Sequence, residues 1–231
     1  MRNATGYGVA GRLSKAVLVL AVLAGTARAE PLELVALGDS LTQGYGLMEE
    51  DGFVPQLEAW LTERGHDVDV INAGVSGDTT AGGLSRAEWS LNDETDAMIV
   101  ALGGNDLLRG IDPAVSKENL SGILDVAAAE GLPVLLAGLP APGNFGAEFK
   151  REFDAMYPDL AEAYGVSLYP NFLAGLADGG DTPARMTRFM QSDGIHPNAE
   201  GVARIVADIG PMVEELLREA SGGTGAEPGS N

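Results

Sequence analysis

The nine residues 38–46, GDSLTQGYG, follow directly on the apolar run LELVAL at 32–37. An apolar run of this length predicts a buried strand, and the glycines after it predict a tight turn. Such a turn has two interpretations. In the first it only joins a strand to a helix, and Asp39 or Ser40 caps that helix. In the second it holds the hydroxyl of Ser40 exposed above the edge of a sheet, where the oxygen can act as a nucleophile.

Four further apolar runs resemble strands: DVDVINA at 67–73, DAMIVAL at 96–102, PVLLAGL at 133–139 and VSLYPNF at 166–172. Between and after them, apolar residues recur at helical spacing over residues 53–64, 113–129, 145–164 and 198–220. Strands that alternate with helices predict a three-layer α/β/α sandwich around a five-stranded, mainly parallel sheet. The sequence thus indicates an α/β fold of the doubly wound, flavodoxin-like type.

Three of the turns that follow strands are rich in glycine and polar residues. They are GDSLTQGYG at 38–46, AGVSGDTTAGG at 73–83 and GGNDLLRG at 103–110. In an open parallel sheet, ligands bind beyond the carboxyl ends of the strands, and each of these turns is predicted to lie there. Their shared position favours a functional interpretation over three unrelated chain reversals.

The chain has only two histidines, His66 and His196. The segment RGHDVDV places His66 at a turn on the opposite end of the sheet, where an exposed surface residue is expected. His196 lies in SDGIHPNAEG, which also has the features of a helix start, with Pro197 at its first turn. Asp193 precedes His196 by three residues, close enough to bind Nδ1 and orient the ring. Together with Ser40, these residues provide a nucleophile, a base and an orienting carboxylate.

Hydrolysis of an acyl bond also needs hydrogen-bond donors for the developing oxyanion. The candidates are the backbone N–H groups of Ser40 and Gly74 and the side-chain amide of Asn105. Each has an ordinary structural alternative: Gly74 as a turn residue after a strand, and Asn105 as a local backbone cap.

Apolar residues beside these positions could line an acyl groove or simply pack in the core. They are Leu41, Val75, Leu107, Leu108 and Ile195.

Four segments, GDSLTQGYG, INAGVSGDT, LGGND and DGIHP, resemble the four signature blocks of the GDSL, or SGNH, hydrolases. The order and spacing of the blocks resemble most the exported bacterial group of thioesterase I, protease I and lysophospholipase L1, often labelled arylesterases. The resemblance implies the SGNH-hydrolase fold, with Ser40 as nucleophile, His196 as base and Asp193 as its partner. It also implies an oxyanion hole formed by Ser40, Gly74 and Asn105.

The activity that the resemblance implies is that of an exported serine esterase acting through an acyl-enzyme. Its substrates would be aryl or short- to medium-chain acyl esters, with acyl thioesters and lysophospholipids as further possibilities. Two alternatives stay open at this point: a carbohydrate acetylesterase of the same family, and a non-catalytic acyl-binding protein. No cofactor is implied. Without cysteine, and with one histidine at the predicted site, there are too few ligands for a catalytic metal.

The first 29 residues have the features of a secretory signal peptide. Basic residues precede the ten-residue apolar run AVLVLAVLAG at 16–25, and Ala27-Arg28-Ala29 fits a cleavage site. The apolar run is half the length needed to span a bilayer, so stable membrane insertion is not expected. The sequence predicts a signal peptide at 1–29, a hydrolase domain at 30–220 and a disordered tail at 221–231, with export to the periplasm or the medium.

The charge of the chain is strongly negative. Four of the 14 basic residues and none of the 34 acidic ones lie in residues 1–29, which leaves −24 on the remainder. Such a surface repels phosphate backbones, so nucleic acid is not an expected partner. The expected partner is a small-molecule substrate, and the sequence carries no signal for an oligomeric state.

Overall fold

The computed structural model describes residues 30–177 and 188–222. The predicted signal peptide and most of the predicted C-terminal tail lie outside these residues.

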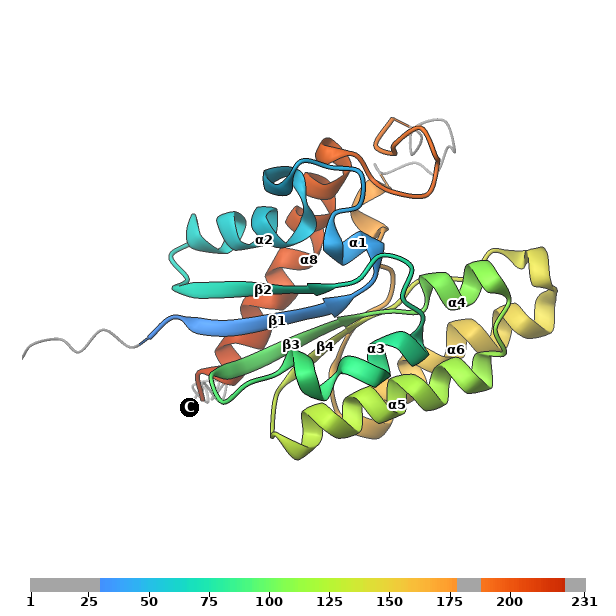
Figure 1. Ribbon diagram of the computed structural model, residues 1–231, viewed down its shortest axis with the longest axis horizontal. Helices are drawn as coiled ribbons and strands as arrows, with labels where there is room; N and C mark the ends of the chain where they lie inside the picture. The colour runs from blue at the N-terminus through green and yellow to red at the C-terminus, as the bar shows by residue number, and fades with distance from the viewer. Residues whose placement is uncertain (1–29, 178–187, 223–231) are drawn as a thin grey trace, which may run out of the picture.

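Five strands form one sheet in the order β2-β1-β3-β4-β5, and every pairing is parallel (Figure 1). This is the order of the flavodoxin-like doubly wound fold. The strands are β1 Leu32–Gly38, β2 Val68–Gly74, β3 Thr95–Ala101, β4 Val134–Ala137 and β5 Ser167–Tyr169. The predicted fold class is confirmed.

The α-helices are α1 Ser40–Gln43, α2 Phe53–Thr62, α3 Thr80–Arg86, α4 Gly104–Arg109, α5 Pro113–Ala129, α6 Ala147–Tyr164 and α8 Ala199–Ala220. Short 3-10 turns lie at Glu49–Asp51, Glu88–Ser90, Gly143–Phe145 and Ala174–Leu176. The four helices expected from periodicity are present, whereas α1, α3 and α4 are too short for their periodicity to be detected.

Helices cover both faces of the sheet and create two cores. On one face α2 and α8 pack against the strands, and on the other face α3, α5 and α6 do so (Figure 1). Alternate residues of β1 divide between the cores, since Leu34 and Ala36 face α2 and α8 while Leu37 joins the opposite cluster. A strand buried on both faces must be apolar throughout, which explains the unbroken run LELVAL.

Because all strands are parallel, their carboxyl ends lie at one edge of the sheet, which we term the carboxyl edge. Register pairing places Gly38 beside Gly74 on one side and beside Ala101 on the other. The three polar turns therefore leave the sheet at the same level.

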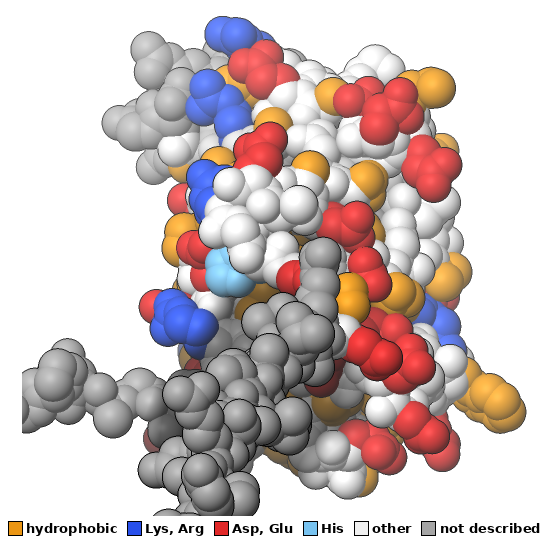
Figure 2. All heavy atoms as spheres, turned by 90° about the vertical axis from the view of Figure 1, so that its left-hand side faces the viewer, with side chains coloured by type: hydrophobic (Ala, Val, Ile, Leu, Met, Phe, Trp, Pro, Cys, Tyr) orange, Lys and Arg blue, Asp and Glu red, His pale blue; other side chains and the backbone are white. Residues whose placement is uncertain are grey.

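Acidic side chains are spread over the face in Figure 2, with few basic ones among them. None of the helices in the described residues is long and apolar enough to span a membrane.

Candidate active site

Ser40 is the first residue of α1, immediately beyond β1. Asp39 caps this short helix, accepting a hydrogen bond from the Leu41 amide at 3.0 Å, and Gly44 ends it with a φ of 86°. Gly38 lets α1 pack against the strand, since a Cβ here would lie 2.6 Å from the Cβ of Thr42. Asp39 thus caps a helix, as the first interpretation predicts. The next residue carries the hydroxyl of the second interpretation, but Ser40 is buried, with 8% of its surface exposed.

The hydroxyl of Ser40 meets the imidazole of His196, although 156 residues separate them in the chain. The distance from Ser40 Oγ to His196 Nε2 is 2.9 Å, and His196 Nδ1 lies 2.6 Å from Asp193 Oδ2. The three side chains therefore form a continuous hydrogen-bonded row at the carboxyl edge, in the order that the sequence predicts.

Asp193 is fixed by the turn that it begins. Its Oδ1 accepts hydrogen bonds from the backbone N–H groups of Ile195 at 2.9 Å and His196 at 3.0 Å. The side-chain hydrogen bond with His196, followed by these two backbone hydrogen bonds, lowers the pKa of the Asp193 carboxyl to about 2. The carboxylate is thus ionised around neutral pH, where it can accept a hydrogen bond from His196 Nδ1 and orient the ring.

Gln191 joins the histidine loop to the segment that follows the serine. Its side-chain amide donates to the carbonyl oxygens of Tyr45 at 2.7 Å and Pro197 at 3.0 Å. The ring of Tyr45 packs against that of His196 with 4.6 Å between centroids. These contacts fix the distance between two segments that no strand pairing connects, and the sequence reasoning did not identify them.

Asn105, on α4, points toward the turns after β1 and β2. Its Nδ2 donates to the backbone oxygen of Asp78 at 2.9 Å and to Asp39 Oδ2 at 3.2 Å. The structure thus brings the amide of Asn105 to the residue beside Ser40. The 3.2 Å hydrogen bond to Asp39 is the longer and therefore the weaker of the two. It is the one that the Asn105 amide can exchange more easily for another acceptor.

Gly74 is at the same edge, but its amide is occupied. The Gly74 N–H donates to Oδ1 of Asn72 at 3.0 Å, and a Cβ at this position would lie 2.3 Å from the backbone nitrogen of Gln43. Close packing of α1 on β2 therefore explains this glycine. The expectation that Gly74 offers a free donor is not met.

Gly77 lies three residues further along the same loop. Its φ is 86°, a conformation that favours glycine, and the next residue is Asp78, whose carbonyl binds Asn105. Within the described part of the chain, the N–H of Gly77 donates no hydrogen bond. The sequence signal for this residue is a glycine between Ser76 and Asp78 in a polar loop, whereas the sequence reasoning assigns the second backbone donor to Gly74.

The five apolar residues predicted to line a groove divide into two groups. Leu107 is buried in the core, and Leu41 lines a space of only about 10 Å³, which has no room for an acyl chain. Val75, Leu108 and Ile195 have exposures of 43%, 60% and 47%. For Leu41 and Leu107 the structure therefore favours the alternative of core packing.

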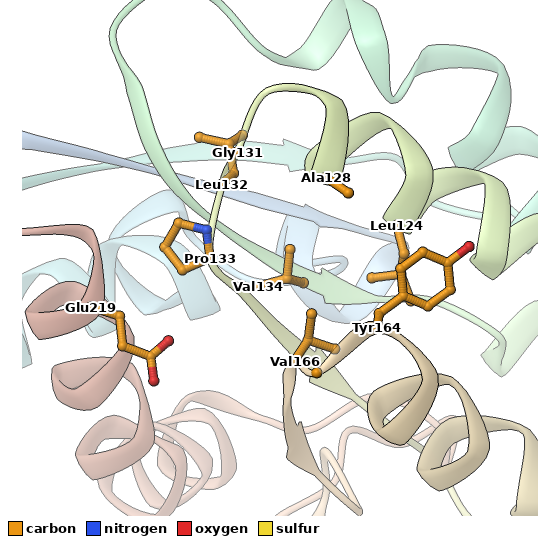
Figure 3. A pocket seen from close by; sticks show the side chains of 10 residues that line it. Leu124, Ala128, Gly131, Leu132, Pro133, Val134, Tyr164, Val166 and Glu219 are labelled. Carbon is orange, nitrogen blue, oxygen red and sulfur yellow. The ribbon is translucent and has the colours of Figure 1, made fainter. Parts of the chain in front are cut away.

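A separate groove of about 390 Å³ lies at the opposite end of the sheet, at the start of β4 (Figure 3). Leu124, Val134 and Val166 line it, with Glu219 and Tyr164 at its sides. Its lining contains no serine, histidine or cysteine, so it offers no nucleophile and base. Among the described residues, no cluster of three or more histidine, aspartate or glutamate side chains could hold a metal ion.

Comparison with known proteins agrees with this geometry. Residues 36–204 match the model of the GDSL-like lipase/acylhydrolase family. The chain is 38% identical to esterase TesA of Pseudomonas aeruginosa over 86% of this chain and 96% of that protein. It is 34% identical to thioesterase 1/protease 1/lysophospholipase L1 of Escherichia coli K12 over 81% of this chain and 86% of that protein.

A solved structure is similar as well. The SGNH-hydrolase family esterase AlinE4 shares 43% sequence identity with a TM-score of 0.66, over 83% of this chain and 99% of that one. Fold and site together define an ester-hydrolysing serine hydrolase. More particularly, the chain belongs to the GDSL-like lipase/acylhydrolase family, as its four sequence blocks predict.

Proposed function

We propose that Ser40, His196 and Asp193 are the catalytic triad of an esterase that works through an acyl-enzyme. The observation that supports this most directly is the hydrogen-bonded row of 2.9 Å and 2.6 Å that joins the three side chains. Ser40 Oγ attacks the acyl carbon while His196 Nε2 takes its proton. The same proton then passes to the leaving alcohol or thiol. Water attacks the acyl-enzyme in the second half-reaction, and Ser40 regains its proton through the imidazole.

We propose an oxyanion hole made of the Ser40 N–H, the Asn105 side-chain amide and the N–H of Gly77. The Ser40 amide is at the N-terminus of α1, where the first backbone donors have no helical acceptor. Gly77 replaces Gly74 in this assignment because the Gly74 amide already binds Asn72. Asn105 takes part by turning its weaker hydrogen bond from Asp39 toward the substrate oxygen.

The proposed substrates are small acyl esters, namely aryl esters and esters of short- to medium-chain acids, with thioesters and lysophospholipids as further members. The names of the relatives, esterase and thioesterase 1/protease 1/lysophospholipase L1, support this range. The exposed Val75, Leu108 and Ile195 offer apolar contact at the surface, which favours shorter chains.

The role of Ser40 is tested with a fluorophosphonate probe and p-nitrophenyl esters. The wild-type protein is expected to be labelled at Ser40 and to hydrolyse the esters, and Ser40→Ala is expected to lose both properties. Ser90→Ala is a matched control, because the hydroxyl of Ser90 lies in a short turn and donates to the Arg86 backbone oxygen. Full esterase activity in Ser40→Ala would overturn the proposed triad.

The substrate class is tested by comparing kcat/KM over p-nitrophenyl esters of increasing chain length, the corresponding acyl thioesters, and acetylated xylan. A preference for p-nitrophenyl esters or thioesters is expected. Efficient release of acetate from xylan, with poor turnover of longer esters, would instead favour the carbohydrate acetylesterase.

Export is also a proposal, and it rests on the features of residues 1–29. Expression of the full chain in a bacterium should yield a protein outside the cytoplasm whose N-terminal residue is Glu30. A cytoplasmic protein that retains residues 1–29 would contradict it.

A further inference from the structure

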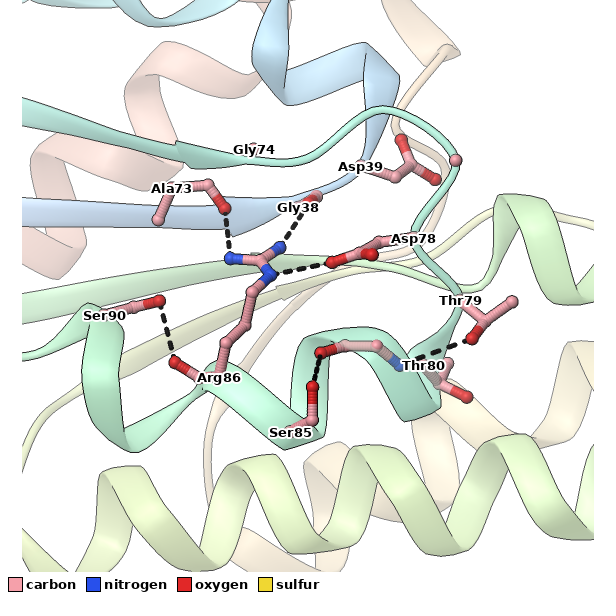
Figure 4. Close-up of polar contacts among 12 residues, drawn as sticks. Gly38, Asp39, Ala73, Gly74, Asp78, Thr79, Thr80, Ser85, Arg86 and Ser90 are labelled. Carbon is pink, nitrogen blue, oxygen red and sulfur yellow. Dashed lines mark hydrogen bonds and ion pairs between the residues drawn. The ribbon is translucent and has the colours of Figure 1, made fainter.

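Arg86, the last residue of α3, makes three side-chain hydrogen bonds next to the candidate site, at the ends of β1 and β2 and in the loop after β2 (Figure 4). Its Nε donates to Asp78 Oδ2 at 2.7 Å. Its two terminal nitrogens donate to the backbone oxygens of Ala73 at 2.7 Å and Gly38 at 2.8 Å. The side chain is only 21% exposed, so water is a poor substitute for these contacts.

The three acceptors belong to segments that the function needs together. Gly38 is the end of β1, two residues before Ser40, and Ala73 is near the end of β2. Asp78 lies in the loop after β2, next to Gly77. Register pairing aligns the ends of the two strands, and the Val75 N–H adds one backbone hydrogen bond to Gly38 O at 3.1 Å, but the pairing of β1 with β2 includes neither Gly77 nor Asp78. Arg86 is thus the side chain that connects this loop to both strand ends.

The connection continues to Asn105. The backbone oxygen of Asp78, whose carboxylate binds Arg86, accepts the 2.9 Å hydrogen bond from Asn105 Nδ2. A shift of Asp78 would therefore move the amide of Asn105 and the neighbouring N–H of Gly77. Two of the three proposed oxyanion donors depend on the position of this one residue.

Charge gives a second reason for a cation at this place. The carbonyl oxygens of Gly38 and Ala73 carry partial negative charge at the edge of the sheet where the oxyanion develops. A guanidinium that binds both oxygens offsets this partial charge, while the Asp78 carboxylate balances the guanidinium's own charge. Arginine suits the task because its planar fork reaches several acceptors at once, which the single ammonium group of lysine does not.

We propose that Arg86 is a positioning residue of the oxyanion hole, which fixes the loop containing Gly77 and Asp78 against the ends of β1 and β2. This inference rests on the proposed function, since it assigns Arg86 to the hole described there. Arg86 touches no reacting atom and acts through Asp78 and the two strand ends.

The test compares wild type with Arg86→Met and Arg86→Lys, using p-nitrophenyl butyrate. Active sites are first counted by complete fluorophosphonate labelling, so that kcat refers to folded, reactive molecules only. Arg64→Met is the matched control: Arg64 is an arginine at the other end of the sheet, which donates to the Trp60 backbone oxygen and stacks on the Trp60 ring.

In Arg86→Met we expect kcat per labelled site to fall about tenfold to a hundredfold with KM nearly unchanged, because misplaced donors weaken transition-state binding rather than substrate binding. Arg86→Lys should show a smaller fall of the same kind, and Arg64→Met should keep the wild-type kcat. A third variant, Arg86→Ala, is made for chemical rescue: added methylguanidinium should restore part of its kcat, whereas methylammonium should not.

The proposal is overturned if Arg86→Met keeps the wild-type kcat per labelled site, even with a lower Tm, since the role of Arg86 would then be structural only. It is overturned equally by a rise in KM at constant kcat. If Arg86→Met does not fold, Arg86→Lys decides the matter by the same criteria. Failure of the proposed function is distinguishable, because it appears as esterase activity that persists in Ser40→Ala.

Discussion

Asp39 is a buried carboxyl group directly before the candidate nucleophile. Only 3% of the residue is exposed, and burial raises the pKa of this carboxyl to about 6, against the lowering effects of the Leu41 amide and Asn105. An ionised Asp39 is therefore held in the fold at neutral pH at a cost in stability. Asp39 also accepts a hydrogen bond from Asn105. The buried carboxylate therefore lowers the stability of the fold but helps to hold Asn105 beside Ser40.

The pH dependence of stability follows from this pKa. The pKa of Asp39 in the folded protein is above the value of 3.8 for the unfolded chain. The contribution of Asp39 to the free energy of unfolding is therefore largest below pH 3.8, where the carboxyl is protonated in both states, and it is lost as the pH rises through 6. Asp39→Asn does not titrate. The difference in unfolding free energy between Asp39→Asn and wild type should therefore grow by roughly 2.5 kcal/mol between pH 4 and pH 8, in favour of the variant.

Denaturant unfolding of both proteins at a series of pH values measures this difference. A difference that stays constant over the range would mean that Asp39 has an ordinary carboxyl pKa. The absolute offset between the two proteins plays no part in the prediction, since only its change with pH is at issue.

Replacement of Asn105 should lower kcat much more than it changes KM. Removal of one oxyanion donor typically lowers kcat about 10²–10³-fold, and we expect a loss of this size in Asn105→Ala with little change in KM. Asn92→Ala is a suitable control, because Asn92, just before β3 at the opposite end of the sheet, also donates from its side-chain amide, to Glu33 Oε1 at 2.8 Å. A kcat in Asn105→Ala equal to that of the control would remove Asn105 from the proposed hole.

At the scale of elements, a buried carboxylate joins three helices. Asp106 on α4 accepts hydrogen bonds from the Thr80 amide at 2.8 Å, the Thr80 hydroxyl at 2.5 Å and the Ser116 hydroxyl at 2.9 Å. Thr80 begins α3 and Ser116 is on α5, so this one group fixes α4 relative to both. Asn105 precedes Asp106 in the chain, and its position depends on this junction.

Asp106→Ala should destabilise the fold by about 3 kcal/mol, because three buried donors lose their acceptor. Asp112→Ala provides the comparison. Asp112 is an exposed cap of α5 that accepts one hydrogen bond from the Ala114 amide, and its loss should cost about 1 kcal/mol. Chemical denaturation of both variants measures the two costs. Equal losses would show that the junction contributes no more than a helix cap.

The long elements were predictable and the short ones were not. The helix at 113–129 was predicted to the residue, since its apolar periodicity, Pro113 and the following Gly131 all agree. Helix α3 was not predicted because Gly82 and Gly83 lie within it, and glycine has a low helix propensity. Close tertiary contacts are the reason that glycine occupies these positions. A Cβ on Gly83 would lie 2.2 Å from Leu102 Cδ1, so helix packing decides that residue.

At the scale of the whole molecule, the charge of −24 on residues 30–231 makes the folded surface repel itself. Figure 2 shows acidic side chains distributed over one face, so many weak repulsions add up rather than one strong one. Salt reduces these repulsions, because the Debye length falls to about 3 Å at 1 M.

We therefore expect the Tm to rise as NaCl is increased from about 0.05 M to 1 M, by roughly 2–4 °C for each kcal/mol of repulsion removed. Potassium chloride should give the same rise, since screening depends on ionic strength and not on the particular cation. A Tm that stays constant or falls in both salts would show that the acidic residues do not destabilise the fold.

The sequence by itself determined the layers, the parallel sheet, the family and the candidate roles of Ser40, Asp193, His196 and Asn105. It could do so because strand periodicity, turn glycines and the four blocks are local signals, each readable within about ten residues. The carboxyl edge then follows from parallel topology, whichever residues form the turns.

Only the tertiary structure decided which groups are free and which are already bonded. It showed that the Gly74 amide binds Asn72 and that Leu107 is in the core. It also revealed that Arg86 connects the ends of β1 and β2 to Asp78. The Asn72–Gly74 hydrogen bond is local, but the burial of Leu107 and the contacts of Arg86 depend on segments that are distant in the chain. No local pattern of residues encodes which donor meets which acceptor across a sheet.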